Sequence, residues 1–175
     1  MGVHKEAERK YIVEVPSSWS KLSEMFDGMM DILKIEQTYL EPEGDEPSPR
    51  VRKTVHGLNG EDVEYHFNQK KPVKPGVHEE KEYEITKAQY EKHLKDARKD
   101  KSEVQKTRFV FKYNDQVFEL DIFKKHLSGL AILEIELSSI SDKVELPPFL
   151  KVIKDVTTDK KFNNYNLATK ELHQD

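Results

Sequence analysis

Along much of the chain, apolar and charged residues alternate with the two-residue period of a β-strand. In residues 5–14, Ala7, Tyr11 and Val13 share one parity, and charged residues fill most of the other. Because successive side chains of a strand point to opposite faces, this run would have one face for a core and one charged face. The same alternation recurs, and we expect eight strands near residues 5–14, 35–40, 49–56, 62–70, 79–86, 104–113, 116–124 and 131–138.

The charged faces differ from the solvated face of an ordinary antiparallel sheet, on which any polar residue serves. Acidic residues form pairs such as Glu134-x-Glu136, whose members lie about 7 Å apart along one strand. Crowded carboxylates need cations nearby to stay ionised. The pattern therefore predicts a face that binds metal ions or, through basic pairs such as Arg50-x-Arg52, a polyanion.

Two further segments have the spacing of helices. The first would begin near Ser17 or Ser18, which can cap a helix. Its apolar stripe comprises Leu22, Met25, Phe26, Met29 and Leu33. A methionine-rich stripe of this kind is typical of core packing and not of a cofactor site.

The second helix would begin at Thr86 and run to Arg98, with Tyr90 and Leu94 on its narrow apolar side. Its opposite side is charged and predicts a solvated face. A short third helix is expected over residues 164–172.

Closure of the eight strands into a barrel would leave no exposed sheet edge. The predicted fold class is therefore α+β, a closed eight-stranded antiparallel β-barrel, or tunnel, with a charged interior and flanking helices. Residues 41–49 and 70–76 are rich in proline and glycine and are expected to be loops at the barrel mouth. Neither is expected to separate domains, so residues 1–175 are predicted to form a single domain.

The composition excludes several classes of protein. The chain has 29 basic and 33 acidic residues, and a net charge of −4 argues against a general nucleic-acid binder. It has no cysteine, which excludes disulfides, thiolate metal sites and cysteine nucleophiles. No apolar run approaches a membrane span, and the first residues lack the apolar region of a signal peptide. We therefore expect a cytoplasmic protein with no membrane or nucleic-acid partner.

Charged motifs follow one another in a specific order, starting with Glu6-x-Glu8-x-Lys10. After it come Gln37-Thr38-Tyr39-Leu40, Arg50-x-Arg52, Lys70, Glu82-x-Glu84, Lys106-x-Arg108, Asp121-x-Phe123, Gly129-Leu130, Glu134-x-Glu136 and Val156-Thr157-x-Asp159. The first motif alone is weak, but the series spans nearly the whole chain. It resembles the CYTH superfamily, the triphosphate tunnel metalloenzymes, and looks most like its small inorganic triphosphatases.

The resemblance implies a role for each group of charged residues. The substrate-binding bases would be Lys10, Arg50, Arg52, Lys70, Lys106, Arg108 and Lys161. The metal-binding acids would be Glu6, Glu8, Asp121, Glu134 and Glu136. Glu82 and Glu84 would lie next to these ligands without binding the metal themselves. The residues expected to be catalytic are Glu6, Glu8, Lys10 and Arg52. Among the bases, the fork of arginine suits phosphate oxygens, whereas lysine supplies a point charge.

The implied activity is metal-dependent hydrolysis of the terminal phosphate of a triphosphate, with Mg²⁺ or Mn²⁺ as cofactor and inorganic tripolyphosphate as the expected substrate. These cations take oxygen ligands and keep waters and phosphate oxygens around them. A metal-activated water would attack the terminal phosphorus. The alternatives are a class IV adenylyl cyclase, a thiamine triphosphatase, and a module that binds polyphosphate or a nucleotide without turnover.

Some positions depart from the family pattern. His78 stands where relatives have an arginine, Lys125 where a glycine is expected, and Lys161-Phe162 where an Arg-Tyr pair is expected. The seven histidines lack the spacing typical of zinc ligands. His56 and His66 share the parity of the basic strand faces, so lining the tunnel mouth is the alternative, but we expect both to be solvated.

Overall fold

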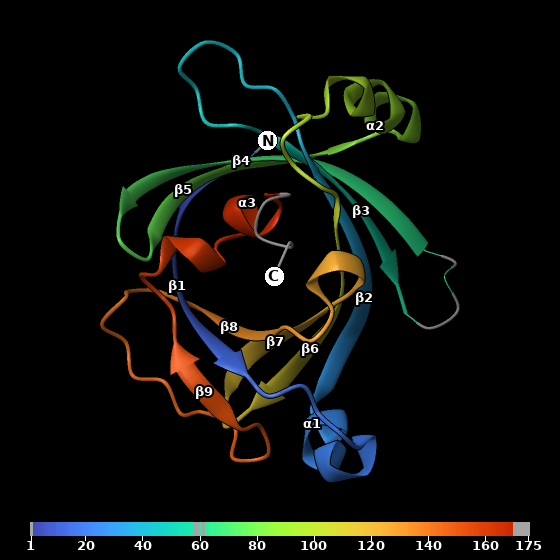
Figure 1. The fold of residues 1–175 in the computed structure, drawn as a ribbon. Coiled ribbons are helices and arrows are strands. Elements are labelled where there is room, and N and C mark those ends of the chain that lie inside the picture. Colours follow the sequence, from blue (N-terminus) through green and yellow to red (C-terminus); the bar gives the residue numbers. More distant parts are fainter. Residues whose placement is uncertain (1, 58–59, 61, 170–175) are drawn as a thin grey trace.

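The chain folds into a closed barrel of antiparallel strands (Figure 1). The computed structural model describes residues 2–57, 60 and 62–169, and within the first strand it describes side chains from Ala7 onward. The barrel strands are β1 (Gly2–Val13), β2 (Met29–Tyr39), β3 (Arg50–His56), β4 (Asp62–Lys74), β5 (Val77–Ile85), β6 (Val104–Tyr113), β7 (Gln116–Phe123) and β8 (Ala131–Leu137). Their order is β5-β4-β3-β2-β6-β7-β8-β1, and β1 also pairs with β5, which closes the ring. The predicted eight-stranded barrel is confirmed.

A ninth strand, β9 (Val152–Asp155), extends the sheet and was not predicted. Strand β5 pairs with β1 only over Gly2–Ala7, and β9 pairs with β1 further along, over Tyr11–Val13. The opposite edge of β1 pairs with β8. β9 therefore covers the stretch of β1 that β5 leaves open, and this prevents an exposed strand edge.

The first predicted helix is much shorter than its apolar stripe indicated. A 3₁₀ turn, η1 (Trp19–Leu22), leads into α1 (Ser23–Asp27), and β2 already begins at Met29. The change occurs at Gly28, where a Cβ atom would lie 2.2 Å from the Lys112 carbonyl oxygen of β6. The prediction that Met29 and Leu33 belong to this helix is wrong, because both lie in β2 and pair with β6.

The second predicted helix is confirmed as α2 (Lys87–His93), which continues as the 3₁₀ turn η2 (Leu94–Asp96). Thr86 caps it as expected: its Oγ1 accepts a hydrogen bond from the Gln89 backbone nitrogen, and the Gln89 side chain accepts one from the Thr86 backbone nitrogen. Tyr90 is buried beneath the helix.

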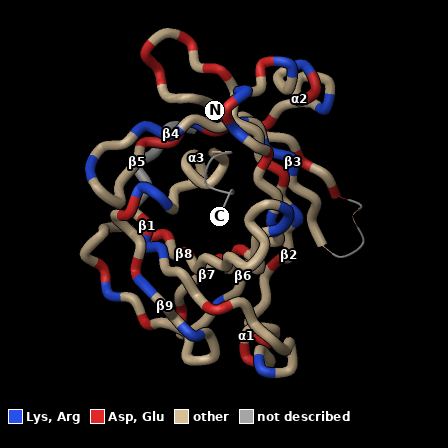
Figure 2. Tube along the Cα trace, viewed as in Figure 1, with Lys and Arg blue, Asp and Glu red and all other residues tan. Residues whose placement is uncertain are grey.

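The apolar faces of the barrel strands point outward and are covered from outside. Met25 of α1 packs with Phe111, Phe118 and Leu120 of β6 and β7. On another side, Tyr90 of α2 packs with the outward residues of β3 and β5. The inward faces carry the charges, and Figure 2 shows that Lys, Arg, Asp and Glu follow the barrel strands as well as the outer loops. None of the helices in the described part of the chain is long and apolar enough to cross a membrane.

The C-terminal segment enters the ring of strands. After β9 it forms η4 (Lys160–Phe162) and α3 (Asn164–Leu167), which Figure 1 shows inside the barrel. Leu167 packs with Tyr39 and Phe123 from the barrel wall, as does the 3₁₀ turn η3 (Lys125–Leu127) through Leu127. The predicted third helix begins at Asn164 as expected but is shorter than predicted: it ends at Leu167, and Thr169 forms an isolated bridge with Lys101. Residues 170–172 of the prediction lie outside the described part of the chain.

Candidate active site

The inward face of the barrel is lined by buried polar side chains. The buried set consists of Lys10, Gln37, Arg50, Thr54, Asn68, Glu80, Lys106, Arg108, Asp121 and Glu134. Burying so many charges is costly unless each finds a partner. The partners of these side chains therefore define what the site can bind.

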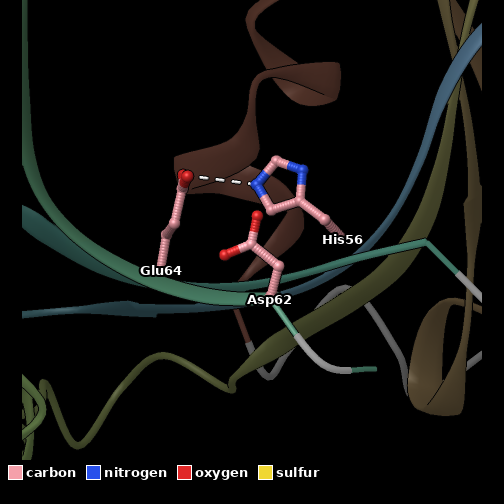
Figure 3. Close-up of side chains that lie close together, drawn as sticks. All are labelled: His56, Asp62 and Glu64. Carbon is pink, nitrogen blue, oxygen red and sulfur yellow. Dashed lines mark ion pairs between the residues drawn. The ribbon is translucent and has the colours of Figure 1, made fainter. Parts of the chain in front are cut away.

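One end of this face, at the β3–β4 hairpin, carries His56 close to Asp62 and Glu64 (Figure 3). The linear spacing of histidines did not predict this grouping, because the hairpin brings its members together. The prediction that His56 is simply solvated is wrong: its side chain is only 26% exposed and contacts Glu64.

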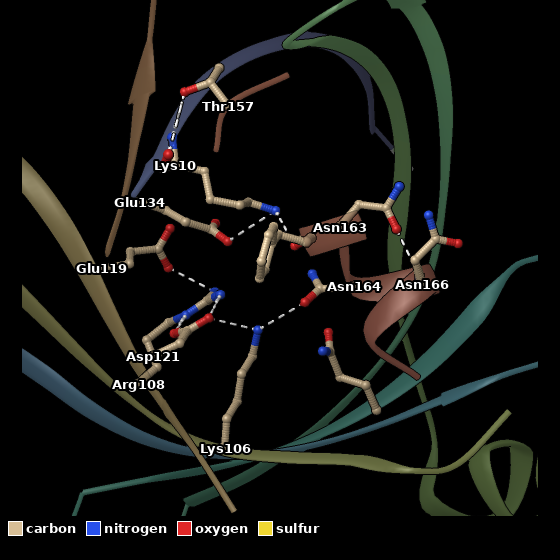
Figure 4. A network of polar contacts seen from close by, with 12 residues as sticks. Lys10, Lys106, Arg108, Glu119, Asp121, Glu134, Thr157, Asn163, Asn164 and Asn166 are labelled. Carbon is tan, nitrogen blue, oxygen red and sulfur yellow. Dashed lines mark hydrogen bonds and ion pairs between the residues drawn. The ribbon is translucent and has the colours of Figure 1, made fainter. Parts of the chain in front are cut away.

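Asp121 of β7 is the centre of a buried network of ion pairs (Figure 4). Arg108 of β6 donates to both of its oxygens, from Nε to Oδ1 at 2.7 Å and from Nη2 to Oδ2 at 2.8 Å. The Lys106 ammonium lies 2.7 Å from Oδ2. Both carboxylate oxygens of Asp121 are therefore held by cations of the protein itself.

The pKa values of this network reflect burial and pairing together. Burial alone would raise the pKa of Asp121, but Arg108 and Lys106 hold it well below its ordinary value. Burial lowers the pKa of Lys106 to about 8, with Arg108 acting in the same direction and Asp121 opposing both. Keeping the buried Lys106 charged costs free energy, and a bound anion would reduce that cost.

Glu119, which the sequence motifs did not single out as a site residue, lies beside Arg108. Its Oε2 lies 2.8 Å from Arg108 Nη1. Across the strand pair it faces Glu134 of β8. Burial raises the pKa of Glu119, and Glu134 and Asp121 raise it further against the effect of Arg108.

The C-terminal segment contacts the bases inside the tunnel. The Lys10 ammonium donates to the Phe162 carbonyl oxygen at 3.2 Å and lies 3.6 Å from Glu134 Oε1. Lys106 donates to Asn164 Oδ1 at 3.5 Å. Oxygen atoms of the segment thus lie where the two lysines would meet oxygen atoms of a phosphate.

Arg50 and Arg52 of β3 are both on the inward face, as their parity predicted. Arg52 is held by Gln37 of β2, whose Oε1 accepts from Nε at 3.0 Å and from Nη2 at 2.7 Å. Burial lowers the pKa of Arg52 to about 10, and the nearby Arg50 and Arg108 contribute. Among the described residues, the buried Arg50 Nε and Gln37 Nε2 have no hydrogen-bond partner.

The acidic side of the tunnel fits a hard divalent cation. Glu8 and Glu136 are paired across β1 and β8, and Glu134 is paired with Glu119 across β8 and β7. Directly opposed carboxylates repel each other. The pKa of Glu119 is raised mainly by burial, and Glu134 adds to that effect. Oxygen donors at this density are those that Mg²⁺ and Mn²⁺ use. The side chain of Glu6, expected beside them, lies outside the described side chains.

A cavity of about 410 Å³ opens at the end of the tunnel that the C-terminal segment occupies. Glu8, Lys10, Arg50 and Lys70 line it together with residues of the predicted mouth loop 41–49 and of the C-terminal segment. It therefore joins one predicted metal ligand to three predicted phosphate-binding bases. The second predicted loop, 70–76, is wrong for most of its length, because β4 continues to Lys74.

Three of the predicted site residues lie at the margin. Glu84 is exposed on β5, and Glu82 is half-buried. Lys161 is exposed, with its ammonium 6.0 Å from the centre of the Phe162 ring. The buried acid of β5 is instead Glu80, which accepts a hydrogen bond from Asn68. Its parity, shared with Glu82, was the signal that could have found it.

No family model matches the chain. An inorganic triphosphatase of Nitrosomonas europaea is 43% identical over 67 residues, which are 37% of this chain and 44% of that protein. The chain thus matches less than half the length of this relative.

Solved structures extend the similarity to nearly the whole chain. A crystal structure of an inorganic triphosphatase has a TM-score of 0.59 and 30% identity, covering 93% of this chain and 97% of that one. A Hippeastrum protein with a dominant triphosphatase activity has a TM-score of 0.53 and covers 77% of this chain and 80% of its own. At 15% identity, the second shows a common fold alone.

Proposed function

The chain belongs to the CYTH superfamily, the triphosphate tunnel metalloenzymes, and from that membership we propose that it hydrolyses the terminal phosphate of inorganic tripolyphosphate. The observation that carries the proposal is the set of buried cationic donors around the cavity. Arg50 lines the cavity and has a buried Nε without an acceptor among the described residues. Buried donors of this kind cost free energy until an acceptor arrives, and phosphate oxygens suit the arginine fork.

The basic residues fall into two groups, a pair of arginines that would bind phosphate oxygens directly and a buried pair that supplies positive charge. Arg50 and Arg52 supply forks for phosphate oxygens, and Gln37 fixes Arg52 by its two hydrogen bonds. Lys106 and Arg108 supply charge from below, and Asp121 positions both. Preorganised charge of this kind stabilises the negative charge that phosphoryl transfer spreads over the terminal oxygens.

The metal would be held by carboxylates of β1 and β8, namely Glu6, Glu8, Glu134 and Glu136. In these positions Mg²⁺ or Mn²⁺ would neutralise phosphate charge and make a bound water more acidic. Asp121 is a weaker candidate ligand than its motif implied, because Arg108 and Lys106 occupy both of its oxygens. Lys10 lies beside Glu134 and holds its ammonium at the border between the acids and the phosphate bases.

The test is phosphate release from tripolyphosphate, pyrophosphate, thiamine triphosphate and ATP, each with Mg²⁺ and with Mn²⁺, alongside a cyclic AMP assay. We expect tripolyphosphate to be hydrolysed with either cation and no turnover in a chelator. Cyclic AMP formation with little phosphate release would assign the chain to the cyclases. Tight tripolyphosphate binding without release would make it a binding module.

A further inference from the structure

A second group of metal-ligating side chains lies away from the candidate active site, where β3 turns into β4 (Figure 3). His56 pairs with Asp62 across the hairpin, and Glu64 follows Asp62 on the same face of β4. One ligand atom from each lies within 4.8 Å of the others. His56 is four residues from Arg52, or about 13 Å along the strand, and β2 separates it from Arg108, because Leu33 pairs with both residues. The group is therefore distinct from the phosphate-binding bases.

Asp31 of β2 fixes the orientation of the His56 ring. Its Oδ2 lies 2.9 Å from Nδ1. A carboxylate at one ring nitrogen holds the proton there and leaves the other nitrogen as a ligand, which is how metal-binding histidines are usually oriented. The other nitrogen, Nε2, is buried and faces Glu64, whose Oε2 lies 3.2 Å away.

We propose that His56, Asp62 and Glu64 bind Zn²⁺, and that Asp31 is the residue that positions the imidazole. One imidazole nitrogen and two carboxylates form the mixed donor set that Zn²⁺ accepts. Mg²⁺ prefers oxygen donors alone and keeps its waters, so it suits the acids of β1 and β8 instead. The bound ion would link β2, β3 and β4 at the tunnel end opposite the C-terminal segment.

The ligands are held by the sheet before the ion arrives. His56 and Asp62 are a register pair, and Asp31 lies on the neighbouring strand β2. Their side chains bring three carboxylates around one imidazole, and a divalent cation would relieve the repulsion among them. The β3–β4 register therefore brings the three ligands together, and Asp31 of β2 orients the histidine, without a dedicated loop.

The test is equilibrium dialysis of the metal-free full chain against Zn²⁺, with excess Mg²⁺ present to compete at the oxygen-only carboxylates. We expect the native sequence to bind one equivalent of Zn²⁺ and His56→Gln to lose it. Asp62 is exposed, so Asp62→Asn should fold normally and still bind Zn²⁺ at least tenfold more weakly. Asp31→Asn should weaken binding by roughly 10- to 100-fold, as is usual for a carboxylate behind a ligating histidine.

His93→Gln, on α2, is the matched control and should bind Zn²⁺ like the native sequence. Zn²⁺ should also raise the Tm of the native sequence and of His93→Gln, but not that of His56→Gln. Equal Zn²⁺ binding by the native sequence, His56→Gln and Asp62→Asn would overturn the proposal, as would loss of the ion on Glu8→Gln. Hydrolysis of tripolyphosphate with Mg²⁺ should persist in Asp62→Asn. A failure of the Zn²⁺ proposal can therefore be distinguished from a failure of the proposed function.

Discussion

At the scale of single residues, buried carboxylates fix the positions of basic side chains in the tunnel. Asp121 accepts two hydrogen bonds from Arg108 and forms an ion pair with Lys106, so both basic side chains are fixed before any substrate binds. Removing one partner of such a buried pair leaves an uncompensated charge, which is strongly destabilising. Residues held by neutral groups, such as Arg52 on Gln37, are therefore the better sites for testing function without unfolding the chain.

Replacing Arg52 by alanine tests the phosphate clamp. We expect kcat/KM for tripolyphosphate to fall roughly 10- to 100-fold, because hydrogen bonds to charged groups contribute about 1.5–3 kcal/mol. Both KM and kcat should change, since a clamp on the terminal phosphate acts in the transition state as well as in binding. Arg52→Lys should restore activity only in part, because one ammonium cannot reproduce the fork. Steady-state phosphate release measures all three.

Lys95→Ala is the control for that experiment. Lys95 is exposed in η2, outside the barrel, and its removal should leave both kinetic constants near those of the native sequence. Equal damage from Lys95→Ala and Arg52→Ala would mean that the inward face is not where phosphate binds.

Replacing Glu8 by glutamine tests the metal ligands. Metal-dependent hydrolysis should be lost, because a neutral amide is a poor replacement for a carboxylate at a hard cation. In the absence of metal, the Tm should hold or rise, since Glu8 is paired with Glu136 and one repulsion is removed. Glu6→Gln should behave alike, and Glu91→Gln on the exposed side of α2 should change neither property. Full metal-dependent turnover in Glu8→Gln would contradict the assignment.

Strand parity predicted much of the site from the sequence. It placed Lys10, Arg50 and Lys106 on the inward face, where they are buried. It could not distinguish Glu80 from Glu82, because both share that face, and the burial of Glu80 beside Asn68 depends on side chains of another strand. It also could not foresee that Asp121 would be occupied by two cations, since that depends on which side chains meet across strands.

At the scale of elements, α1 and α2 cover the outside of the barrel, whereas α3 lies inside it. The outer position of α2 can be tested. Thr86→Ala removes the oxygen that accepts from the Gln89 backbone nitrogen. The free energy of unfolding should fall by about 1 kcal/mol, the usual cost of losing a cap. Tripolyphosphate hydrolysis should be unchanged, because α2 covers the outer face of the barrel. Chemical denaturation and phosphate release measure the two effects, with Lys87→Ala as control.

A large loss of kcat in Thr86→Ala, without loss of stability, would contradict this assignment and mean that α2 affects catalysis inside the tunnel.

The elements that were predicted correctly are those whose period extends over many residues. The barrel strands alternate for seven or more residues, and the capping sequence at Thr86 is local. The first helix was overextended because the apolar spacing of Met29 and Leu33 suits a helix, whereas close packing of Gly28 on Lys112 sends the chain into β2. β9 has only four residues and is defined by the edge of β1 that it covers, which no local pattern reports.

At the scale of the whole molecule, the barrel reverses the usual arrangement of a core. Two of its apolar clusters lie between the strands and the outer segments, and the charged residues lie inside. A third apolar cluster packs the C-terminal segment against Tyr39 and Phe123 inside the barrel. The two ends of the tunnel also differ. One end has the cavity, the bases and the C-terminal segment, and the other has His56 with its carboxylates. A linear polyanion would therefore enter from the first end, where Lys10, Arg50 and Lys70 meet it.

The arrangement of bases along the tunnel predicts a ranking of substrates. Tripolyphosphate can contact Arg50 at the cavity and extend toward Arg52 and Lys106, whereas pyrophosphate is too short to meet all of them at once. We expect kcat/KM to be higher for tripolyphosphate than for ATP, and pyrophosphate to be a poor substrate, because binding energy from the remote phosphates positions the terminal one. Phosphate release under identical Mg²⁺ concentrations measures the ranking. Arg52→Ala should reduce the difference in kcat/KM between tripolyphosphate and pyrophosphate, since it removes a contact that only tripolyphosphate reaches. Equal turnover of pyrophosphate and tripolyphosphate by the native sequence would show that two phosphates fill the site, and that the bases deeper in the tunnel serve another purpose.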